Sequence, residues 1–423
     1  MKARRARLLV PLLAAVLLLS SCASPLEASL PQLETKTLLT VLVGESTSDP
    51  GIGDMLRERV QSAFPGVELE WESVDWGEGF SARLSARIAS GETPDIIIGK
   101  AQDVYAFQPT GALGVFPQEL GGLLTPEGTA STTLEGKLYG LTYNQLYQGV
   151  LYNKNIFYRY NLQVPETLRE MEQVVERLQS VGVTPFATHF QETWYTGNIL
   201  MQFAIGEVFD KTPDWGERLR AGEVSFGDSP YRLCCEQVLY QFQNSWPDVL
   251  TIAQGESDLR FAGEEAAMYL TGTWSMQTLQ SVAPYRKLGI FPYPTREGGA
   301  KLISEPNITF MKSASTRHDT LIDEILGMVF TDEELAQTLC AFTQTDTTLA
   351  GVRADSLSMI REDIEKYRAQ NRIISAAAGN NQLIWAFQYD CAQSLMDYLQ
   401  GKVTLHTVLS GWDALRQESS LGR

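Results

Sequence analysis

Residues that could carry out chemistry are common in this chain, but none of them stands in a recognised catalytic or metal-binding pattern. The sequence has no G-x-S-x-G, H-E-x-x-H or G-x-x-x-x-G-K-[ST] segment. His189, His318 and His406 are far apart in sequence and form no ligand spacing. We therefore expect no cofactor, no metal ion and no catalytic residue. Carboxylate pairs are numerous enough that a hydrolase acting through two acidic groups remains an alternative.

The chain is instead rich in aromatic rings, with eight Trp, sixteen Tyr and seventeen Phe. Most such rings pack in cores, but a flat ring beside polar groups can also hold a small molecule that has apolar faces and hydroxyl edges. The rings we select follow a strand-like run or stand among Gly and polar residues. They are Trp76, Trp194, Tyr195 and Trp274.

Three polar residues come shortly after strand-like runs. Glu45 and Ser46 come after the apolar run 37–43, and Asp103 follows the run 96–98 after a short loop. Ligands of open α/β sheets bind at the carboxyl ends of the strands. We therefore expect these three side chains to contribute to a binding site.

The elements that must position these residues alternate along the chain. Strand-like runs at 37–43, 67–71 and 96–98 are separated by segments with apolar residues at helical spacing, which end at Gly66 and Gly91. The order β-α-β-α-β predicts a parallel sheet covered by helices. Two capping-box patterns, at 167–170 and 331–334, predict the starts of two later helices.

The N-terminus has the features of an export signal. Residues 2–7 hold four basic side chains, 8–19 are uncharged and apolar, and Leu-Ser-Ser-Cys ends at Cys22. This order resembles the bacterial lipobox, so we expect residues 1–21 to be a signal peptide and Cys22 to carry lipid. The alternatives are an ordinary secretory signal and an N-terminal membrane anchor. Residues 22–35 would then form a tether, and the protein would be extracytoplasmic and attached to the membrane by lipid alone.

Composition excludes several partners. The formal net charge is −17, and loss of the four basic residues of the signal changes it to −21. Nucleic acid requires a basic face, and anionic lipid surfaces attract basic segments, so neither is an expected partner. The length suggests two domains. Apart from Cys22 there are four cysteines, whose pairing the sequence leaves open.

Four segments, read in order, resemble extracellular solute-binding proteins of ABC importers, in particular the sugar-binding family that includes maltose-binding proteins. They are SGETPDII (90–97), the long run LEGKLYGLTYNQLYQGVLYNKNIFYRYNLQVP (134–165), GEEAAMYLTGTW (263–274) and GIFPYP (289–294). The sequence departs from the family pattern at Thr142, where Pro is usual. A second departure is Asn155, where Asp often follows the Tyr-Asn-Lys motif.

The resemblance implies a two-lobed α/β fold of the class II periplasmic-binding-protein type, with hinge segments between the lobes. The first lobe would comprise 36–143 and 306–347, and the second 148–303 and 348–423. The crossings would lie near 142–147, 304–309 and 345–350. At the first two crossings we select Asn144, Gln145, Glu305 and Asn307 as site residues. The resemblance adds Trp385, because the family often places a stacking ring in the C-terminal third.

The resemblance also implies a function. The chain would capture a small solute, with a sugar or oligosaccharide as the expected class, between its lobes as a monomer and deliver it to the transmembrane subunits of an ABC permease. Two alternatives belong to other classes. They are an extracellular carbohydrate-active hydrolase and a lipoprotein adhesin.

Overall fold

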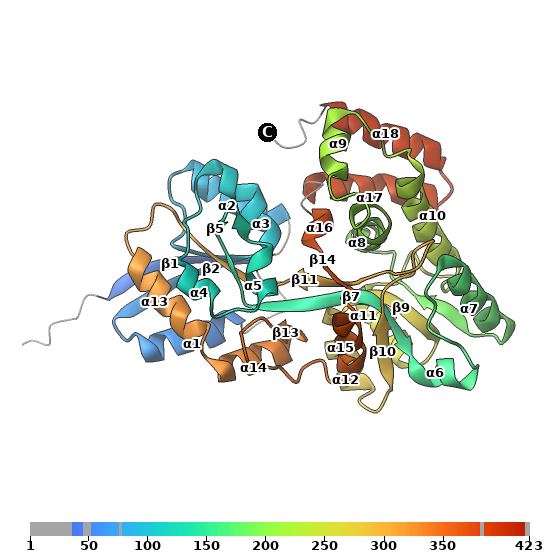
Figure 1. Cartoon of the computed structure of the whole chain (residues 1–423), viewed down its shortest axis with the longest axis horizontal. Coiled ribbons are helices and arrows are strands. Elements are labelled where there is room, and N and C mark those ends of the chain that lie inside the picture. The colour runs from blue at the N-terminus through green and yellow to red at the C-terminus, as the bar shows by residue number, and fades with distance from the viewer. Residues whose placement is uncertain (1–35, 45–51, 76–77, 381–384, 419–423) are drawn as a thin grey trace, which may run out of the picture.

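The computed structural model describes residues 36–44, 52–75, 78–380 and 385–418. Two α/β lobes lie side by side and are joined by long strands that run from one lobe into the other (Figure 1). The predicted two-lobed fold is confirmed. Each lobe has its own sheet and its own hydrophobic core.

The first lobe contains a five-stranded sheet in the order β2-β1-β3-β12-β6. Its strands are β1 (Thr37–Gly44), β2 (Val67–Val74), β3 (Ile96–Gly99), β6 (Leu141–Thr142) and β12 (Thr309–Lys312). β1 pairs in parallel with both β2 and β3, which confirms the predicted parallel arrangement. β12 is antiparallel to β3, because it enters this sheet from the other lobe.

Helices cover both faces of the first sheet, since alternate residues of a strand point to opposite faces. Leu39, Val41 and Val43 belong to one core cluster, whereas Leu42 of the same strand belongs to another. The helices of this lobe are α1 (Ile52–Ala63), α2 (Glu78–Ala89), α3 (Ala101–Phe107), α4 (Gln118–Gly121), α5 (Pro126–Ala130), α13 (Asp319–Val329) and α14 (Glu333–Thr343). A small hairpin, β4 (Thr133–Leu134) and β5 (Lys137–Leu138), completes it.

The second lobe is built on a seven-stranded sheet in which β7 (Asn144–Asn153) is central. The path β14-β11-β7-β9-β8 describes five strands, and β10 and β13 also pair with β7. Their bounds are β8 (Thr184–Ala187), β9 (Ala266–Gly272), β10 (Leu288–Phe291), β11 (Leu302–Pro306), β13 (Asp346–Thr347) and β14 (Ile373–Ser375). All ten residues of β7 are buried, as expected for a strand covered on both faces.

The helices of the second lobe are α6 (Lys154–Arg159), α7 (Leu168–Ser180), α8 (Thr193–Ala204), α9 (Trp215–Ala221), α10 (Ser229–Gln243), α11 (Gln254–Ala262), α12 (Met276–Val282), α15 (Arg361–Ala369), α16 (Ala377–Asn380), α17 (Trp385–Leu399) and α18 (Leu405–Glu418). A π-helical turn, Ile205–Phe209, continues α8. Of these helices, α16 lies against α3 of the first lobe as well as against α8 (Figure 1).

Three segments pass between the lobes. The first runs from β6 into β7, and the second from β11 into β12. The third contains β13, which pairs with the start of β7. Leu349 and Val352 still pack in the first lobe, whereas Leu357 lies in the core of the second. The third crossing segment therefore enters the second lobe a few residues after position 347/348, where the limit between the lobes was predicted.

The two predicted capping boxes have different outcomes. Thr167 and Glu170 form the expected box at the start of α7, with reciprocal side-chain bonds of 3.2 Å to the two backbone N–H groups. The box predicted at 331–334 is wrong. Asp332 caps α14 by accepting from the backbone N–H of Leu335 at 2.9 Å, while Thr331 bonds back to the preceding helix.

Within the described part of the chain, no helix is long and apolar enough to cross a membrane. The same residues contain no group of three or more His, Cys, Asp or Glu side chains that could hold a metal ion. Cys234, Cys235, Cys340 and Cys391 are all buried free thiols.

Candidate functional site

A row of polar side chains runs along the crossing segments. Lys100 stands directly after β3 in the first lobe, and its Nζ donates to Asn307 Oδ1 at 3.0 Å. The same ammonium lies 3.9 Å from Glu305 Oε1. Gln148 of β7 donates to the other carboxylate oxygen of Glu305. Residues distant in sequence therefore meet where the two lobes join.

The row continues onto α8 of the second lobe. Asn198 Nδ2 donates to Gln148 Oε1 at 3.1 Å, and Gln202 Nε2 donates to Asn198 Oδ1 at 2.8 Å. Trp194, Asn198 and Gln202 are spaced by four residues, so they share one face of the helix and span about 12 Å along it. The charged groups therefore join this helix face through Gln148 at Asn198, one turn away from the Trp194 ring.

Two tryptophans form an aromatic pair at the start of α8. The rings of Trp194 and Trp274 are 6.2 Å apart at 71°, an edge-to-face contact. Trp194 remains 38% exposed. The Trp274 ring lies over the end of β9, where a Cβ on Gly272 would stand 2.1 Å from a ring carbon. Gly272, two residues before Trp274, must therefore lack a side chain for the Trp274 ring to occupy this position.

Buried groups support the aromatic pair. His189 Nδ1 lies 2.7 Å from Glu192 Oε2, which also accepts from the backbone N–H of Gln254 at 2.9 Å. Burial lowers the pKa of His189, which keeps its ring neutral near pH 7. The His189 ring lies 3.8 Å from that of Tyr195 and 5.2 Å from that of Trp194. This set of contacts fixes the orientation of the helix start.

The expectation that Tyr195 contributes to the surface of the site is corrected. Its side chain is fully buried, and its hydroxyl donates to the Leu270 carbonyl at 3.0 Å. Trp194 and Tyr195 are adjacent on a helix, and adjacent helical residues face different directions. Of the Trp194 and Tyr195 rings, only one can therefore be exposed, and the other packs in the core.

Asn144 and Gln145 are also corrected, because both are buried parts of the hinge. Asn144 Nδ2 donates to Thr345 Oγ1 at 2.8 Å, and its Oδ1 accepts from the Ile308 N–H at 3.0 Å. Gln145 donates to the Tyr147 hydroxyl at 3.1 Å and accepts from Ser304. These bonds tie the crossing segments together, and both residues are buried.

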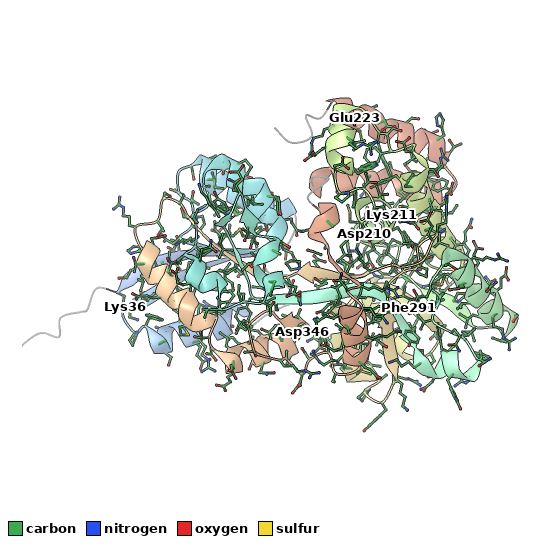
Figure 2. The ribbon with its side chains drawn as sticks, viewed as in Figure 1. Lys36, Asp210, Lys211, Glu223, Phe291 and Asp346 are labelled. Atoms are coloured by element: carbon green, nitrogen blue, oxygen red, sulfur yellow. The ribbon has the colours of Figure 1, made fainter. Side chains whose placement is uncertain are left out.

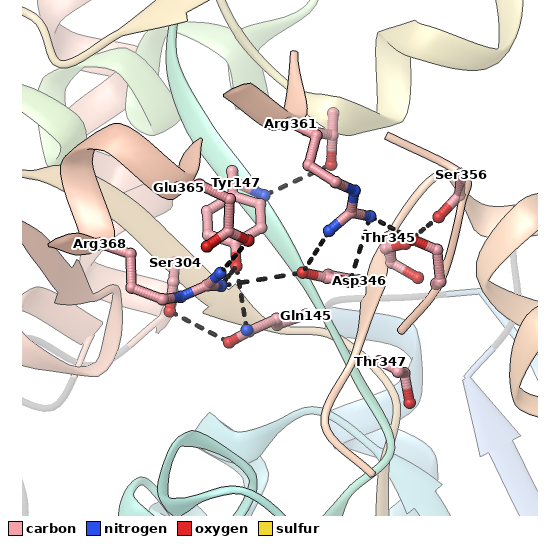
Figure 3. Close-up of polar contacts among 12 residues, drawn as sticks. Gln145, Tyr147, Ser304, Thr345, Asp346, Thr347, Ser356, Arg361, Glu365 and Arg368 are labelled. Atoms are coloured by element: carbon pink, nitrogen blue, oxygen red, sulfur yellow. Dashed lines mark hydrogen bonds and ion pairs between the residues drawn. The ribbon is translucent and has the colours of Figure 1, made fainter. Parts of the chain in front are cut away.

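A buried ion pair lies in the third crossing. Asp346 of β13 is 3.4 Å from Arg361 and 3.8 Å from Arg368, both on α15 (Figure 3). Arg368 also donates to the Tyr147 hydroxyl at 2.6 Å. Asp346 lies between the two lobes (Figure 2). The ion pair therefore fixes the third crossing segment to the second lobe.

Asp103 occupies the first turn of α3. Its Oδ2 accepts from the backbone N–H of Lys100 at 2.7 Å, which closes the start of the helix. Burial raises the pKa of this carboxyl to about 6. Asp103 therefore caps the start of α3. It stands three residues after Lys100, whose ammonium belongs to the polar row.

The remaining predicted residues are only partly placed. Glu45, Ser46 and Trp76 lie outside the described residues, as does Cys22. Trp385 begins α17, but its side chain is not among those described. Sequence reasoning had missed Lys100, Gln148, Asn198 and Gln202. Lys100 had a usable signal, since it follows the same strand as Asp103, whereas the other three lie inside regular elements.

The lobes also touch beside the polar row. Ser131 of the first lobe lies 3.1 Å, oxygen to oxygen, from Ser375 at the end of β14. Ser375 pairs with Ser304 of β11, so this contact lies beside the second crossing strand. The next element, α16, also lies against α3 of the first lobe.

Comparison with known proteins identifies the architecture. The model of the bacterial extracellular solute-binding protein family matches residues 48–334. A multiple sugar-binding protein of Streptococcus mutans is 24% identical over 56% of this chain and 58% of its own length, so the matched part spans under two thirds of that relative.

Solved structures show the same fold. A binding protein of Bacillus subtilis in an open conformation has a TM-score of 0.76 at 17% identity, covering 91% of this chain and 98% of its own. A sugar transporter of Bacillus licheniformis in complex with stachyose has a TM-score of 0.72 at 17% identity, covering 90% and 100%. From the extent of the family match, the chain belongs to the bacterial extracellular solute-binding protein family.

Proposed function

We propose that this chain is the lipid-anchored solute-binding component of an ABC importer. It captures a small carbohydrate between its two lobes as a monomer and delivers it to the transmembrane subunits of a permease. The chain itself catalyses no reaction. Membrane attachment rests on the lipid at Cys22.

The observation that carries the proposal is the combination of rings and polar groups along α8. Trp194 and Trp274 supply flat apolar faces, and Asn198 and Glu305 supply amide and carboxylate groups along the row. A sugar has apolar C–H faces and a hydroxyl edge, so both kinds of surface are matched. The likeness to a structure in complex with stachyose supports the same class.

Calorimetry on the mature domain, without residues 1–35, tests solute capture. The panel is raffinose, stachyose and chitin oligosaccharides, with thermal unfolding measured in parallel. A ligand at 100 times its Kd should stabilise the native state by about 2.7 kcal/mol. Released reducing ends would indicate a hydrolase instead. Absence of heat with every panel sugar would contradict carbohydrate capture and favour the adhesin alternative.

Anchoring is tested separately. Cys22→Ala should leave an uncleaved precursor or move the protein into the soluble fraction. Globomycin-sensitive processing and labelling with a fatty-acid analogue should be lost in this variant. If it were processed and membrane-bound like the wild type, the lipid proposal would be wrong.

A further inference from the structure

We propose that the side-chain carbonyl of Gln202 accepts a hydrogen bond from one hydroxyl of the solute. Gln202 thereby acts as a specificity-determining residue, and Glu305 positions its amide through a chain of two other amides. The inference rests on the proposed function, because it adds a contact at the α8 end of the same polar row.

The direction of this amide chain is set at its charged end. The oxygens of an ionised carboxylate only accept, so Gln148 must turn its Nε2 toward Glu305. Gln148 Oε1 then faces Asn198, whose Nδ2 donates to it at 3.1 Å. Asn198 Oδ1 is left to accept from Gln202 Nε2 at 2.8 Å. All three bonds therefore run in one direction, and the chain ends on the carbonyl oxygen of Gln202.

That terminal carbonyl oxygen has no donor within the described part of the chain. Gln202 is 5% exposed, and its Oε1 is buried without a hydrogen-bond partner. Buried carbonyl groups are nearly always paired, because an unsatisfied acceptor costs free energy. Turning the Gln202 amide over brings no relief, since its oxygen would then face Asn198 Oδ1, which is also an acceptor. The chain thus holds an acceptor in place for a donor that the described residues do not supply.

The surroundings of Gln202 place this acceptor near the point where the lobes meet. Gln202 shares one face of α8 with Asn198 and Trp194. The preceding residue, Met201, packs against α16, where a Cβ on Gly379 would stand 2.7 Å from Met201 Sδ. Helix α16 also lies against α3 of the first lobe (Figure 1). A solute that lies along this face of α8 therefore has Gln202 at the end nearest α16.

The polarity of the contact selects the solute group. A hydroxyl or an amide N–H can donate to Gln202 Oε1, whereas an ether oxygen, a fluorine substituent or a carboxylate cannot. A hydroxyl is the donor that the proposed carbohydrate offers. Because the acceptor is largely removed from water, the bond meets little competition from solvent.

Calorimetry with raffinose, stachyose or a chitin oligosaccharide, whichever binds the wild type, tests the contact. Gln202→Met keeps the length of the side chain and removes its amide, so binding should weaken about 3- to 10-fold. The unliganded variant should unfold close to the wild-type temperature, because loss of the bond to Asn198 is offset by removal of the unpaired carbonyl. Gln241→Met is the matched control, since Gln241 is a fully buried glutamine on α10 of the same lobe, and it should bind as the wild type does.

Monodeoxyfluoro derivatives of the same sugar separate contact from support. In each derivative one hydroxyl is replaced by fluorine, which cannot donate. One derivative should bind the wild type about 3- to 10-fold less tightly than the parent sugar, and Gln202→Met should bind the two equally. Glu305→Gln allows the amide chain to reverse, so it should lose part of the same discrimination, whatever its own effect on affinity. A merely structural role of Glu305 would lower the affinity for parent and derivative alike.

Three results would overturn the inference. They are unchanged affinity of Gln202→Met, an equal deficit of every fluorinated derivative in Gln202→Met and wild type, which would leave a buried water as the donor, and full discrimination in Glu305→Gln. The comparison of derivatives on Glu305→Gln keeps the inference testable if Gln202→Met does not fold. If no panel sugar bound the wild type, the proposed function itself would fail, and this contact would fail with it.

Discussion

At the residue scale, exposure separates side chains that can contact a solute from those that hold the fold. Trp194 and Tyr195 are neighbours in sequence, yet one ring is partly exposed and the other is fully buried. The same contrast divides the polar candidates. The Glu305 side chain is 14% exposed, whereas Asn144 is fully buried and both ends of its amide are bonded within the hinge.

Trp194→Ala should weaken sugar binding about 5- to 30-fold, because loss of a stacked ring costs roughly 1–2 kcal/mol. The melting temperature should change little, since the ring is 38% exposed and closes no core. Tyr158→Ala is the matched control, because that ring is 90% exposed on α6. Equal affinity of Trp194→Ala and wild type would place the solute elsewhere.

Asp258 makes stability depend on pH. The residue is 2% exposed, and burial raises the pKa of its carboxyl to about 6 from 3.8. Because the folded-state pKa lies above the unfolded one, the native state is favoured at low pH. That advantage is lost as pH rises through about 6.

Asp258→Asn removes this titration. The variant should gain roughly 2 kcal/mol in unfolding free energy relative to wild type between pH 4 and pH 8. Denaturant unfolding of both proteins at several pH values measures the difference. The exposed Asp390→Asn serves as the control. A difference that is independent of pH would show that Asp258 ionises normally in the native state.

At the element scale, the three crossing segments are tied to one another and to the second lobe. Asn144 bonds to residues of the second and third crossings, and α15 contacts β13 through Asp346. Short strand pairings continue the second sheet into the hinge, where β13 pairs with the start of β7. The crossing segments are also tied together on the first-lobe side, where the Tyr143 N–H donates to the Ile308 carbonyl at 2.7 Å and the Thr348 N–H donates to the Tyr143 carbonyl at 3.2 Å.

Asp346→Ala should destabilise the protein by about 3 kcal/mol or more, because it leaves the Arg361 guanidinium buried without a counter-charge. Denaturant unfolding measures the loss. Asp397→Ala breaks the exposed pair with Lys402 and should cost less than about 1 kcal/mol. Comparable losses in the two variants would contradict the importance of burial at the hinge.

At the scale of the whole molecule, the lobes are joined by the crossings and also touch at one further edge. Ser131 and Ser375 bring that edge within 3.1 Å. We expect this contact to break if the lobes separate. Solute would then enter when this contact opens.

The double variant Ser131→Cys/Ser375→Cys should form a cross-link when oxidised, because the two side-chain oxygens are already in contact. The association rate of a bound panel sugar should fall at least tenfold, and reductant should restore it. Stopped-flow tryptophan fluorescence follows the rate, with Ser131→Cys alone as the control. A cross-linked protein that binds at the wild-type rate would argue against opening at this edge.

The parallel half of the first sheet and its covering helices were predictable from the sequence, because they depend on local periodicity and on turn residues. The strand 37–43, the helix start at Thr167 and the strand 96–98 all follow from such signals. The same local reasoning misplaced the start of α14. Two candidate caps, Thr331 and Asp332, stand side by side there, and Asp332 is used because the Thr331 hydroxyl donates back to the Gly327 carbonyl of the preceding helix.

The site itself could be predicted only in part. Trp274 and Glu305 could be selected as candidates because they follow a turn or stand at a crossing, whereas Asn198 and Gln148 lie within regular elements that give no local sign of their partners. Lys100, Gln148, Asn198 and Glu305 come together because strands from two lobes meet at the hinge. The sequence by itself determined the family, the two lobes and the three parallel strands of the first sheet. Only the tertiary structure decided which side chains meet between them, because burial and long-range hydrogen bonds depend on packing that no local pattern encodes.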